Sequence, residues 1–474
     1  MSAQPNSHIS TPRHCMRAPF IVSVVGTLAL AFALLTAAKS LPQEKSQPKS
    51  AVPAAHASAT KQKLASRAEY VGDTACAACH QDISTNYNKT AHHLTSQPAN
   101  PDTVVGDFQP GANTMTTANA NLTFRMDRKG DEFLQTAIWE SPDAATEAAA
   151  TQTAADSTKQ TAQPPKSSSG ARTRTERLDL VIGSGGKGQN YLFWRNDELF
   201  QLPVGYSTVL HHWINSPGYR DGTANFDRPI VPRCLECHAG YFDSTFPGTD
   251  SNLYDTKNFV LGITCERCHG PARKHVAAYH QNNAAKSAAA TDSASQNAKS
   301  PQTSATTVAS DNIVNPAKLP TARRADICAQ CHGGAGVREI LPEFSYVAGQ
   351  PLEKYIDLGL IDQALDVDVH GKQGKLMMKS RCYQASRTME CSTCHDVHKK
   401  EPDLAAMSQR CLTCHKVEPS PTHEAIGASI SKNCIDCHMP ALESKVVNVN
   451  VDGKLHYPRF RTHWIKIYSE SERQ

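Results

Sequence analysis

The hydrophobic and polar positions along the chain divide it into one long apolar run, an alternating region and several polar tracts. The apolar run, residues 19–38 (PFIVSVVGTLALAFALLTAA), carries no charge and is long enough to span a bilayer. Two arginines and no acidic residue precede it, which predicts that everything after residue 40 is exported. We interpret residues 1–40 as a membrane anchor or a signal peptide, for which Ala38-Lys39-Ser40 offers a cleavage site.

Alternation of apolar and polar residues predicts strands in the first half of the chain. Residues 121–140 (NLTFRMDRKGDEFLQTAIWE) alternate on both sides of a KGD turn, and residues 177–184 and 189–204 also read as strands. The glycines of GSGGKGQN, residues 183–190, fit no nucleotide-binding fingerprint and favour a hairpin turn. We therefore predict a small antiparallel β insertion over residues 102–207.

The composition of other segments predicts a linker, two insertions and short helices. Residues 41–66 are rich in Ala, Lys, Gln, Ser and Pro, which is typical of a disordered linker. Residues 141–176 and 281–310 have too few aromatic and branched residues to form a core, so we expect two surface insertions of low complexity. Short helices are expected at 81–96 and 403–416.

A five-residue pattern, Cys-x-x-Cys-His, occurs seven times, and the copies are numbered here in chain order. Its cysteines are Cys76 and Cys79, Cys234 and Cys237, Cys265 and Cys268, Cys328 and Cys331, Cys391 and Cys394, Cys411 and Cys414, and Cys434 and Cys437. Its histidines are His80, His238, His269, His332, His395, His415 and His438. This pattern is typical of covalent haem c attachment, in which two thiols bond the porphyrin and the histidine becomes the proximal iron ligand. It predicts seven haems.

Two other chemistries use a Cys-x-x-Cys, and the count argues against both. Structural zinc usually takes two such pairs, so seven is an awkward number, and a four-thiolate site would leave the histidine without a role. A thioredoxin-like redox pair is expected once, beside a βαβ pattern. Of the sixteen cysteines, only Cys15 and Cys382 lie outside the motifs, so no disulfide framework is needed.

The net charge of the protein is expected to change from positive to negative when the predicted haems are included. The chain has 49 basic and 45 acidic residues, a formal net charge of +4. Each haem brings two propionates, so the loaded protein should be acidic unless many of them are neutralised. We therefore expect no nucleic-acid partner.

Most of residues 69–465 resembles a known family, the multihaem c-type cytochromes of the c-554 class, which are related to the pentahaem nitrite reductases and octahaem hydroxylamine oxidoreductases. The resemblance is carried by YVGDTACAACHQDI with TAHH behind it, RCLECHAGYFD followed by ITCERCHGPARKHV, SRCYQASRTMECSTCHDVH, and NCIDCHMP. It implies a haem-packed, exported protein that moves electrons.

The same resemblance implies a mainly α, loop-rich multihaem cytochrome c fold, with the β insertion between the first and second motifs. We expect residues 67–474 to form one seven-haem domain. All seven motifs end in His, so the chain lacks the Cys-x-x-Cys-Lys of the nitrite reductases, and too few residues follow position 440 for their long C-terminal helices. Their enzymatic activity therefore does not carry over to this chain.

Haem irons need sixth ligands, and imidazole is a common one. The 21 histidines, less seven in the motifs and three before residue 66, leave eleven candidates. His275 stands where the family has its distal histidine, in CHGP…HV. The predicted distal ligands are His92, His212, His275, His398, His423 and His463, with His211 as the alternative to His212 and His370 as a weaker choice.

We predict an electron-transfer protein on the periplasmic side of the cytoplasmic membrane, either anchored or secreted. Its partners would be redox proteins, including a membrane quinol-oxidising system. The alternative is an oxidoreductase that acts on a nitrogen or sulfur oxyanion or on hydroxylamine at one open haem. Arg381, Cys382 and Tyr383 in SRCYQ are the candidates for such a site. A structural interpretation competes: Arg paired to a propionate, Tyr packed on a porphyrin and Cys buried as a small hydrophobe.

Overall fold

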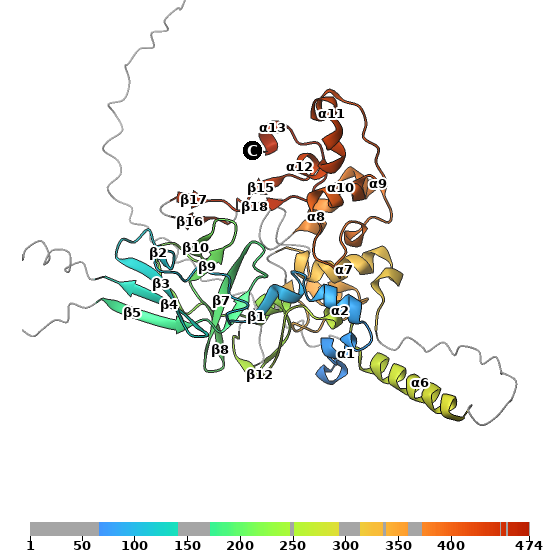
Figure 1. Ribbon diagram of the computed structural model, residues 1–474, viewed down its shortest axis with the longest axis horizontal. Helices are drawn as coiled ribbons and strands as arrows, with labels where there is room; N and C mark the ends of the chain where they lie inside the picture. Colours follow the sequence, from blue (N-terminus) through green and yellow to red (C-terminus); the bar gives the residue numbers. More distant parts are fainter. Residues whose placement is uncertain are drawn as a thin grey trace, which may run out of the picture. The chain divides into compact units, whose positions relative to one another are not determined.

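The helices and strands that the computed structural model describes lie between Arg67 and Arg473 (Figure 1). The described residues are 66–140, 171–246, 251–292, 313–334, 338–358, 372–445, 447–451 and 454–473. The apolar run at 19–38 and nearly all of the predicted linker therefore lie outside them. Among the described residues, no helix has the length and apolar character needed to cross a membrane.

A four-stranded antiparallel sheet forms where the sequence alternates. Its strands, in sheet order, are β2 (Thr114–Thr116), β3 (Leu122–Lys129), β4 (Glu132–Trp139) and β5 (Arg172–Arg177). β3 and β4 pair from Leu122 and Trp139 to Lys129 and Glu132. Gly130, at φ 62°, makes the tight turn between them, because a residue without a Cβ adopts positive φ at no steric cost. The predicted hairpin is confirmed.

A second, six-stranded sheet combines β1 (Ser96–Pro98), which precedes the first sheet in the chain, with strands that follow it. Those strands are β6 (Leu180–Ile182), β7 (Gly188–Arg195), β8 (Glu198–Gln201), β9 (Val204–Ser207) and β10 (His212–Asn215). β6 and β7 are antiparallel neighbours joined by the glycine-rich stretch, as predicted, and two of its glycines, Gly183 and Gly185, have positive φ. The β region therefore extends past residue 207, the expected end of the insertion.

The two sheets share one apolar core. Phe124 and Met126 of β3, and Tyr191 and Phe193 of β7, are all buried in the same cluster. Gln135 of β4 adds a polar link, because its side-chain amide both donates to the Val204 carbonyl and accepts from the Val204 amide, at 3.0 and 3.1 Å. Alternating burial along β3 explains why period-two hydrophobicity located this region.

The rest of the described chain is built from short helices and two-stranded hairpins. The helices are α1 (Asp73–Ala77), α2 (Gln81–Tyr87), α4 (Pro232–His238), α5 (Cys265–His269), α6 (Arg273–Asp292), α7 (Thr321–His332), α8 (Gln373–Met378), α9 (Arg381–Ala385), α10 (Leu404–Cys411), α11 (Pro421–Ile426), α12 (Cys434–His438) and α13 (Glu470–Arg473). The hairpins pair β11 (Ala239–Ser244) with β12 (Tyr254–Leu261), β13 (Arg338–Glu339) with β14 (Ile356–Asp357), β15 (Ala441–Glu443) with β18 (Arg459–Arg461), and β16 (Val449–Val451) with β17 (Lys454–His456).

The expectation of a mainly α fold is wrong. Helices make up 31% of the structure and strands 26%, distributed over many small sheets. Most helices are only one or two turns long, and several of them, such as α1, α5 and α12, are little more than a Cys-x-x-Cys-His motif or part of one. The loop-rich character that accompanied the expectation is present.

Two predicted segments have different boundaries in the structure. The helix expected at 81–96 ends at Tyr87, and a 3₁₀ turn, η3 (His93–Thr95), then leads into β1. The Thr90 hydroxyl donates to the Tyr87 carbonyl, which favours ending the helix there. α6 continues to Asp292, into the expected insertion at 281–310, whose remainder lies outside the described residues.

Candidate haem-attachment sites

Each motif sits on a helical turn that brings its three functional side chains together. In the first, fifth and sixth motifs, the amide of the motif histidine donates to the carbonyl of the first cysteine at 2.8 to 3.0 Å. The fifth motif forms a 3₁₀ turn, η7 (Cys391–Thr393), and α10 ends at the sixth. Residues three and four apart lie on one face of such a turn, so the two thiols and the imidazole can hold one group.

Four motif histidines have their Nδ1 atom engaged by a neighbouring group. Nδ1 of His269 lies 2.8 Å from the Val314 carbonyl oxygen, and Nδ1 of His438 lies 3.0 Å from that of Lys466. A carbonyl only accepts, so in these two histidines Nδ1 carries the proton and Nε2 keeps its lone pair for a metal. The other two Nδ1 contacts are His395 with Glu401 at 3.1 Å and His238 with Thr95 at 3.1 Å.

Three motif histidines face a second histidine from a distant part of the chain. The ring centroids are 6.1 Å apart for His92 and His332, 6.0 Å for His269 and His398, and 6.2 Å for His395 and His463. Two metal–nitrogen bonds of about 2 Å, plus about 1 Å from each nitrogen to its ring centre, span about 6 Å. The spacing therefore fits two imidazoles on opposite sides of one haem iron.

Burial favours the neutral form of four of these six imidazoles. Loss of hydration lowers the pKa of His92, His269 and His332, and lowers that of His463 to about 4. Neutral imidazole is the form that binds a metal, so the burial and the proposed ligand role agree.

The remaining predicted distal histidines have weaker structural support. Burial and the nearby His80 imidazole both lower the pKa of His275, which places it beside the first motif. Nδ1 of His423, on α11, contacts the Glu418 carbonyl at 2.5 Å. His423 stays a prediction, and His370 lies outside the described residues.

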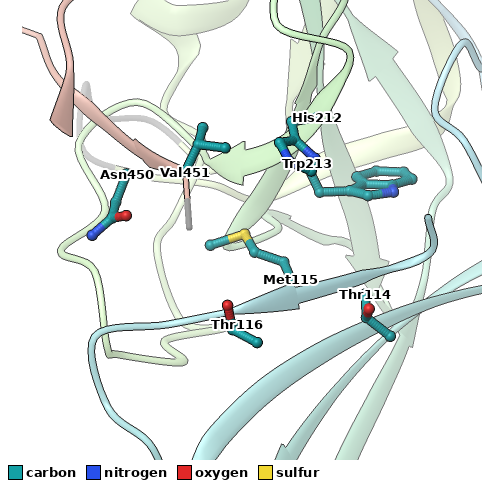
Figure 2. Close-up of a pocket in the computed structure, with 7 residues that line it drawn as sticks. All are labelled: Thr114, Met115, Thr116, His212, Trp213, Asn450 and Val451. Atoms are coloured by element: carbon teal, nitrogen blue, oxygen red, sulfur yellow. The ribbon is translucent and has the colours of Figure 1, made fainter. Parts of the chain in front are cut away.

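His212, on β10, lines a cavity that contains no motif residue. It shares this small cavity with Met115, Trp213 and Val451, together with Thr114, Thr116 and Asn450 (Figure 2). No motif cysteine or histidine lines this cavity, so the cavity itself does not place His212 opposite a motif histidine. Its neighbour His211 has φ 53°, a strained value for a residue with a side chain. His212 as an iron ligand also stays a prediction.

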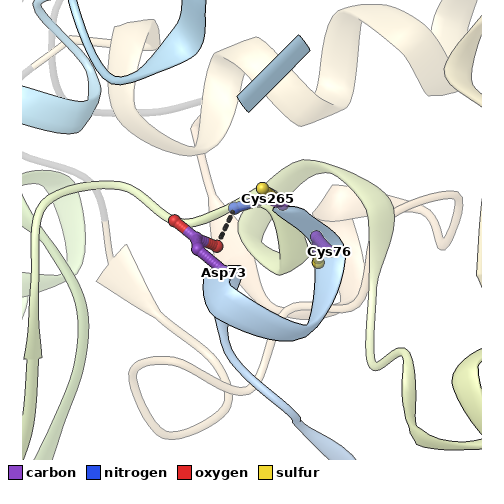
Figure 3. Close-up of side chains that lie close together, drawn as sticks. All are labelled: Asp73, Cys76 and Cys265. Atoms are coloured by element: carbon purple, nitrogen blue, oxygen red, sulfur yellow. Dashed lines mark hydrogen bonds between the residues drawn. The ribbon is translucent and has the colours of Figure 1, made fainter. Parts of the chain in front are cut away.

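Thiols from different motifs lie side by side. In three pairs the two thiols are close enough to affect each other's pKa: Cys76 with Cys265, Cys237 with Cys331, and Cys328 with Cys391. In the first pair, both sulfur atoms and an Asp73 carboxylate oxygen lie within 4.8 Å of one another (Figure 3). That set could hold a metal ion, but both sulfurs belong to haem motifs and cannot serve both purposes. The pairs show which motifs are neighbours in space.

Buried residues between the motif cysteines were not foreseen from the sequence. Glu266, in the third motif, is 5% exposed, and its carboxylate accepts from the amides of Val71, Gly72 and Ala272 at 2.8 to 3.0 Å. It therefore connects the third motif to the segment that begins the first. A charged residue inside a Cys-x-x-Cys is visible in the sequence, but its burial depends on contacts with residues almost two hundred positions away.

Arg381, Cys382 and Tyr383 lie on α9, which starts beside a predicted distal ligand. The Ser380 hydroxyl donates to the His463 carbonyl at 3.2 Å and accepts from the Ile465 amide at 2.7 Å. Arg381 is exposed, and the two residues after it are partly exposed. The structure therefore places the set near the fifth motif's imidazole pair, while its role in a reaction stays a prediction.

Comparisons with known proteins agree with the chemistry of the motifs. A family model described as cytochrome c554 and c-prime matches residues 219–270, which contain the second and third motifs. The crystal structure of the outer cell wall cytochrome OcwA is similar with a TM-score of 0.46 and 15% identity, covering 84% of this chain and 80% of that one. No curated protein matches the chain. The family match and the motifs support an electron-transferring c-type cytochrome with several haems.

Proposed function

We propose that this protein is an exported heptahaem c-type cytochrome that relays electrons between membrane and periplasmic redox partners. The observation that carries the proposal is the set of three motif histidines, each facing a second imidazole at about the spacing of two axial ligands. Haem supplies one-electron chemistry when it is bound.

Two imidazoles per iron favour electron exchange over substrate turnover. Both axial positions are then taken by protein side chains, so a small molecule has no place to coordinate. The distal residues come from segments far from their motifs: His92 follows the first motif but faces the fourth, and His398 follows the fifth but faces the third. Each such pair also ties two parts of the chain together.

Contacts between motifs suggest the order of the relay. The thiol pairs make the first motif a neighbour of the third, the second a neighbour of the fourth, and the fourth a neighbour of the fifth. Arg267 of the third motif hydrogen-bonds Gln330 of the fourth, which joins the two groups. We propose a path through motifs one, three, four and five, with the second motif as a branch at the fourth.

The proposal is tested by the haem content of the mature protein. Intact mass after denaturation should exceed the apo mass by seven haem increments, because thioether bonds survive unfolding. The pyridine haemochrome spectrum should show haem c in the same ratio. A protein that carries zinc on its cysteines, or disulfides between the paired motifs, would contradict the proposal.

The proposed location and partners follow from the predicted N-terminal segment. Haem attachment through thioethers occurs outside the cytoplasmic membrane, which suits an exported chain held at or released from that membrane. A membrane quinol-oxidising system is the proposed electron donor. Cell fractionation with antibody detection, compared between the full chain and a chain lacking residues 1–40, would test the location.

A further inference from the structure

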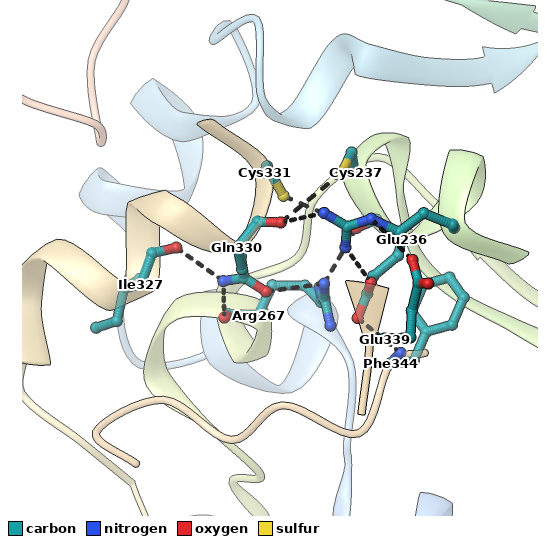
Figure 4. Close-up of polar contacts among 9 residues, drawn as sticks. Glu236, Cys237, Arg267, Ile327, Gln330, Cys331, Glu339 and Phe344 are labelled. Carbon is teal, nitrogen blue, oxygen red and sulfur yellow. Dashed lines mark hydrogen bonds and ion pairs between the residues drawn. The ribbon is translucent and has the colours of Figure 1, made fainter. Parts of the chain in front are cut away.

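Three motifs meet at residues that lie between their own cysteines. Glu236 of α4, Arg267 of α5 and Gln330 of α7 each occupy the third position of a Cys-x-x-Cys, and they are 2%, 6% and 3% exposed. They form one buried polar junction (Figure 4). Here the junction means these three residues together with Arg233 and Phe344.

Arg267 holds the junction together. Its Nη2 donates to the Glu236 carbonyl at 3.0 Å and to the Gln330 side-chain oxygen at 2.9 Å. The Gln330 amide returns a bond to the Arg267 carbonyl at 3.4 Å. Arg233 donates to the Gln330 carbonyl at 2.9 Å, which adds a fourth link. The guanidinium group therefore bridges the second and fourth motifs from inside the third.

Within the part of the chain that the structure describes, Arg267 has no counter-ion of its own at the junction, because the two carboxylates nearby, those of Glu236 and Glu339, both pair with Arg233. The Glu236 carboxylate is taken by Arg233 and by the Phe344 amide, at 2.9 Å from the latter. Among the described residues, no carboxylate lies within ion-pair distance of Arg267, whose Nε is buried without a partner and whose guanidinium lies over the Phe344 ring at 5.4 Å. A buried cation without a counter-ion is costly, so its retention here calls for a reason.

Motif thiols surround this cation. The Cys331 sulfur donates to the Glu236 carbonyl at 3.9 Å, the same oxygen that accepts from Arg267. The Cys237 sulfur donates to the Gln330 carbonyl at 4.0 Å, and Cys268 follows Arg267 directly in the chain. The charge therefore lies close to the attachment points of three haems.

We propose that Arg267 is a positioning residue whose buried charge raises the reduction potential of the haems attached at this junction. This inference rests on the proposed haem-binding function. Oxidised haem iron carries one more positive charge than reduced iron, so a cation held nearby in a medium of low dielectric constant favours the reduced form. The haems at the junction would then be reduced before the others in the relay, and would pass electrons on through the second motif.

The test compares redox titrations of variants that change the charge in opposite directions. Arg267→Gln should lower the midpoint potential of the haems attached at the junction by about 59 mV, which is a tenfold change in the equilibrium constant for their reduction. Glu236→Gln should raise it, because a buried negative charge is lost. Arg267→Lys keeps the charge and should stay near the wild-type curve. Arg338→Gln, whose side chain is 71% exposed, is the control and should shift nothing.

Each outcome decides the proposal. Opposite shifts for the Gln variants of Arg267 and Glu236, with rescue by Lys, support a charge role. The proposal would be overturned if Arg267→Gln and Arg267→Lys lowered the midpoint potential equally. It would also be overturned if both variants kept their full haem content and neither shifted the potential; either result would leave Arg267 a packing role only. If Arg267→Gln does not fold, the direction of the Glu236→Gln shift decides. A wild-type protein without haem by mass would instead contradict the proposed function.

Discussion

At the residue scale, the imidazole pairs are the most direct link between sequence and chemistry. His269 is held by a backbone carbonyl on its Nδ1 and faces His398 across 6.0 Å. The motif fixes the first histidine by spacing alone. The second comes from beyond the fifth motif, so only folding brings it into place.

Replacing His398 should open one haem. His398→Ala removes the proposed distal imidazole of the third haem, so electron paramagnetic resonance of the oxidised protein should show one new high-spin iron that binds cyanide. The covalent haem count should not change, since thiols and proximal histidine are intact. His280→Ala is the matched control, because His280 is exposed. An unchanged spectrum would mean that His398 is not a ligand.

The histidines that face motif histidines were partly foreseeable from sequence, while their role as iron ligands stays a prediction. His92, His398 and His463 were expected from a family resemblance and lie opposite motif histidines, at 6.0 to 6.2 Å. The partner of each could not be read from the chain, because it depends on contacts between distant segments. Arg267 and Glu236 were missed for a similar reason: nothing local distinguishes a buried charged residue in a short helix from an exposed one.

At the element scale, the strands were more predictable than the helices. Period-two hydrophobicity located β3 and β4 because one face of each is buried against the second sheet. The motif helices are too short to show a period, and their position is set by side chains such as Glu266 that join separate elements. Family resemblance therefore misled the fold class toward α, while the pattern itself did not.

Glu266 should be a major stabilising contact between elements. Glu266→Ala leaves the buried amide of Ala272 and the partly buried amides of Val71 and Gly72 without an acceptor, so we expect the free energy of unfolding to fall by about 3 kcal/mol. Urea denaturation followed in the Soret band measures this. Glu266→Gln should lose less, since its amide oxygen still accepts. Glu353→Ala, at an exposed ion pair, should cost under about 1 kcal/mol, and equal losses at both sites would contradict the argument.

At the scale of the whole molecule, the seven Cys-x-x-Cys-His motifs lie close to one another. Neighbouring motifs touch through thiols, buried charges or imidazoles contributed by other motifs' flanks, so no motif is an independent module. The β region has a core of its own between its two sheets, but the second sheet also packs on the second motif, because Leu192 and Leu199 share a buried cluster with Leu235. Haem attachment at the second motif should therefore depend on the folding of this sheet.

Axial closure of the irons is the property that separates a relay from an enzyme. Three imidazole pairs are present among the described residues, and further histidines stand near other motifs, so we expect at most one iron to respond to nitrite, hydroxylamine or cyanide. Titration followed by electron paramagnetic resonance gives the number of responding irons. If one responds, Arg381→Ala and Tyr383→Phe test whether α9 forms its substrate site, because Ser380 ties the start of α9 to the chain around His463. Arg387→Ala, another exposed arginine just beyond α9, is the control. Two or more open irons would contradict the relay, whereas one open iron indifferent to both α9 variants would place the substrate site elsewhere.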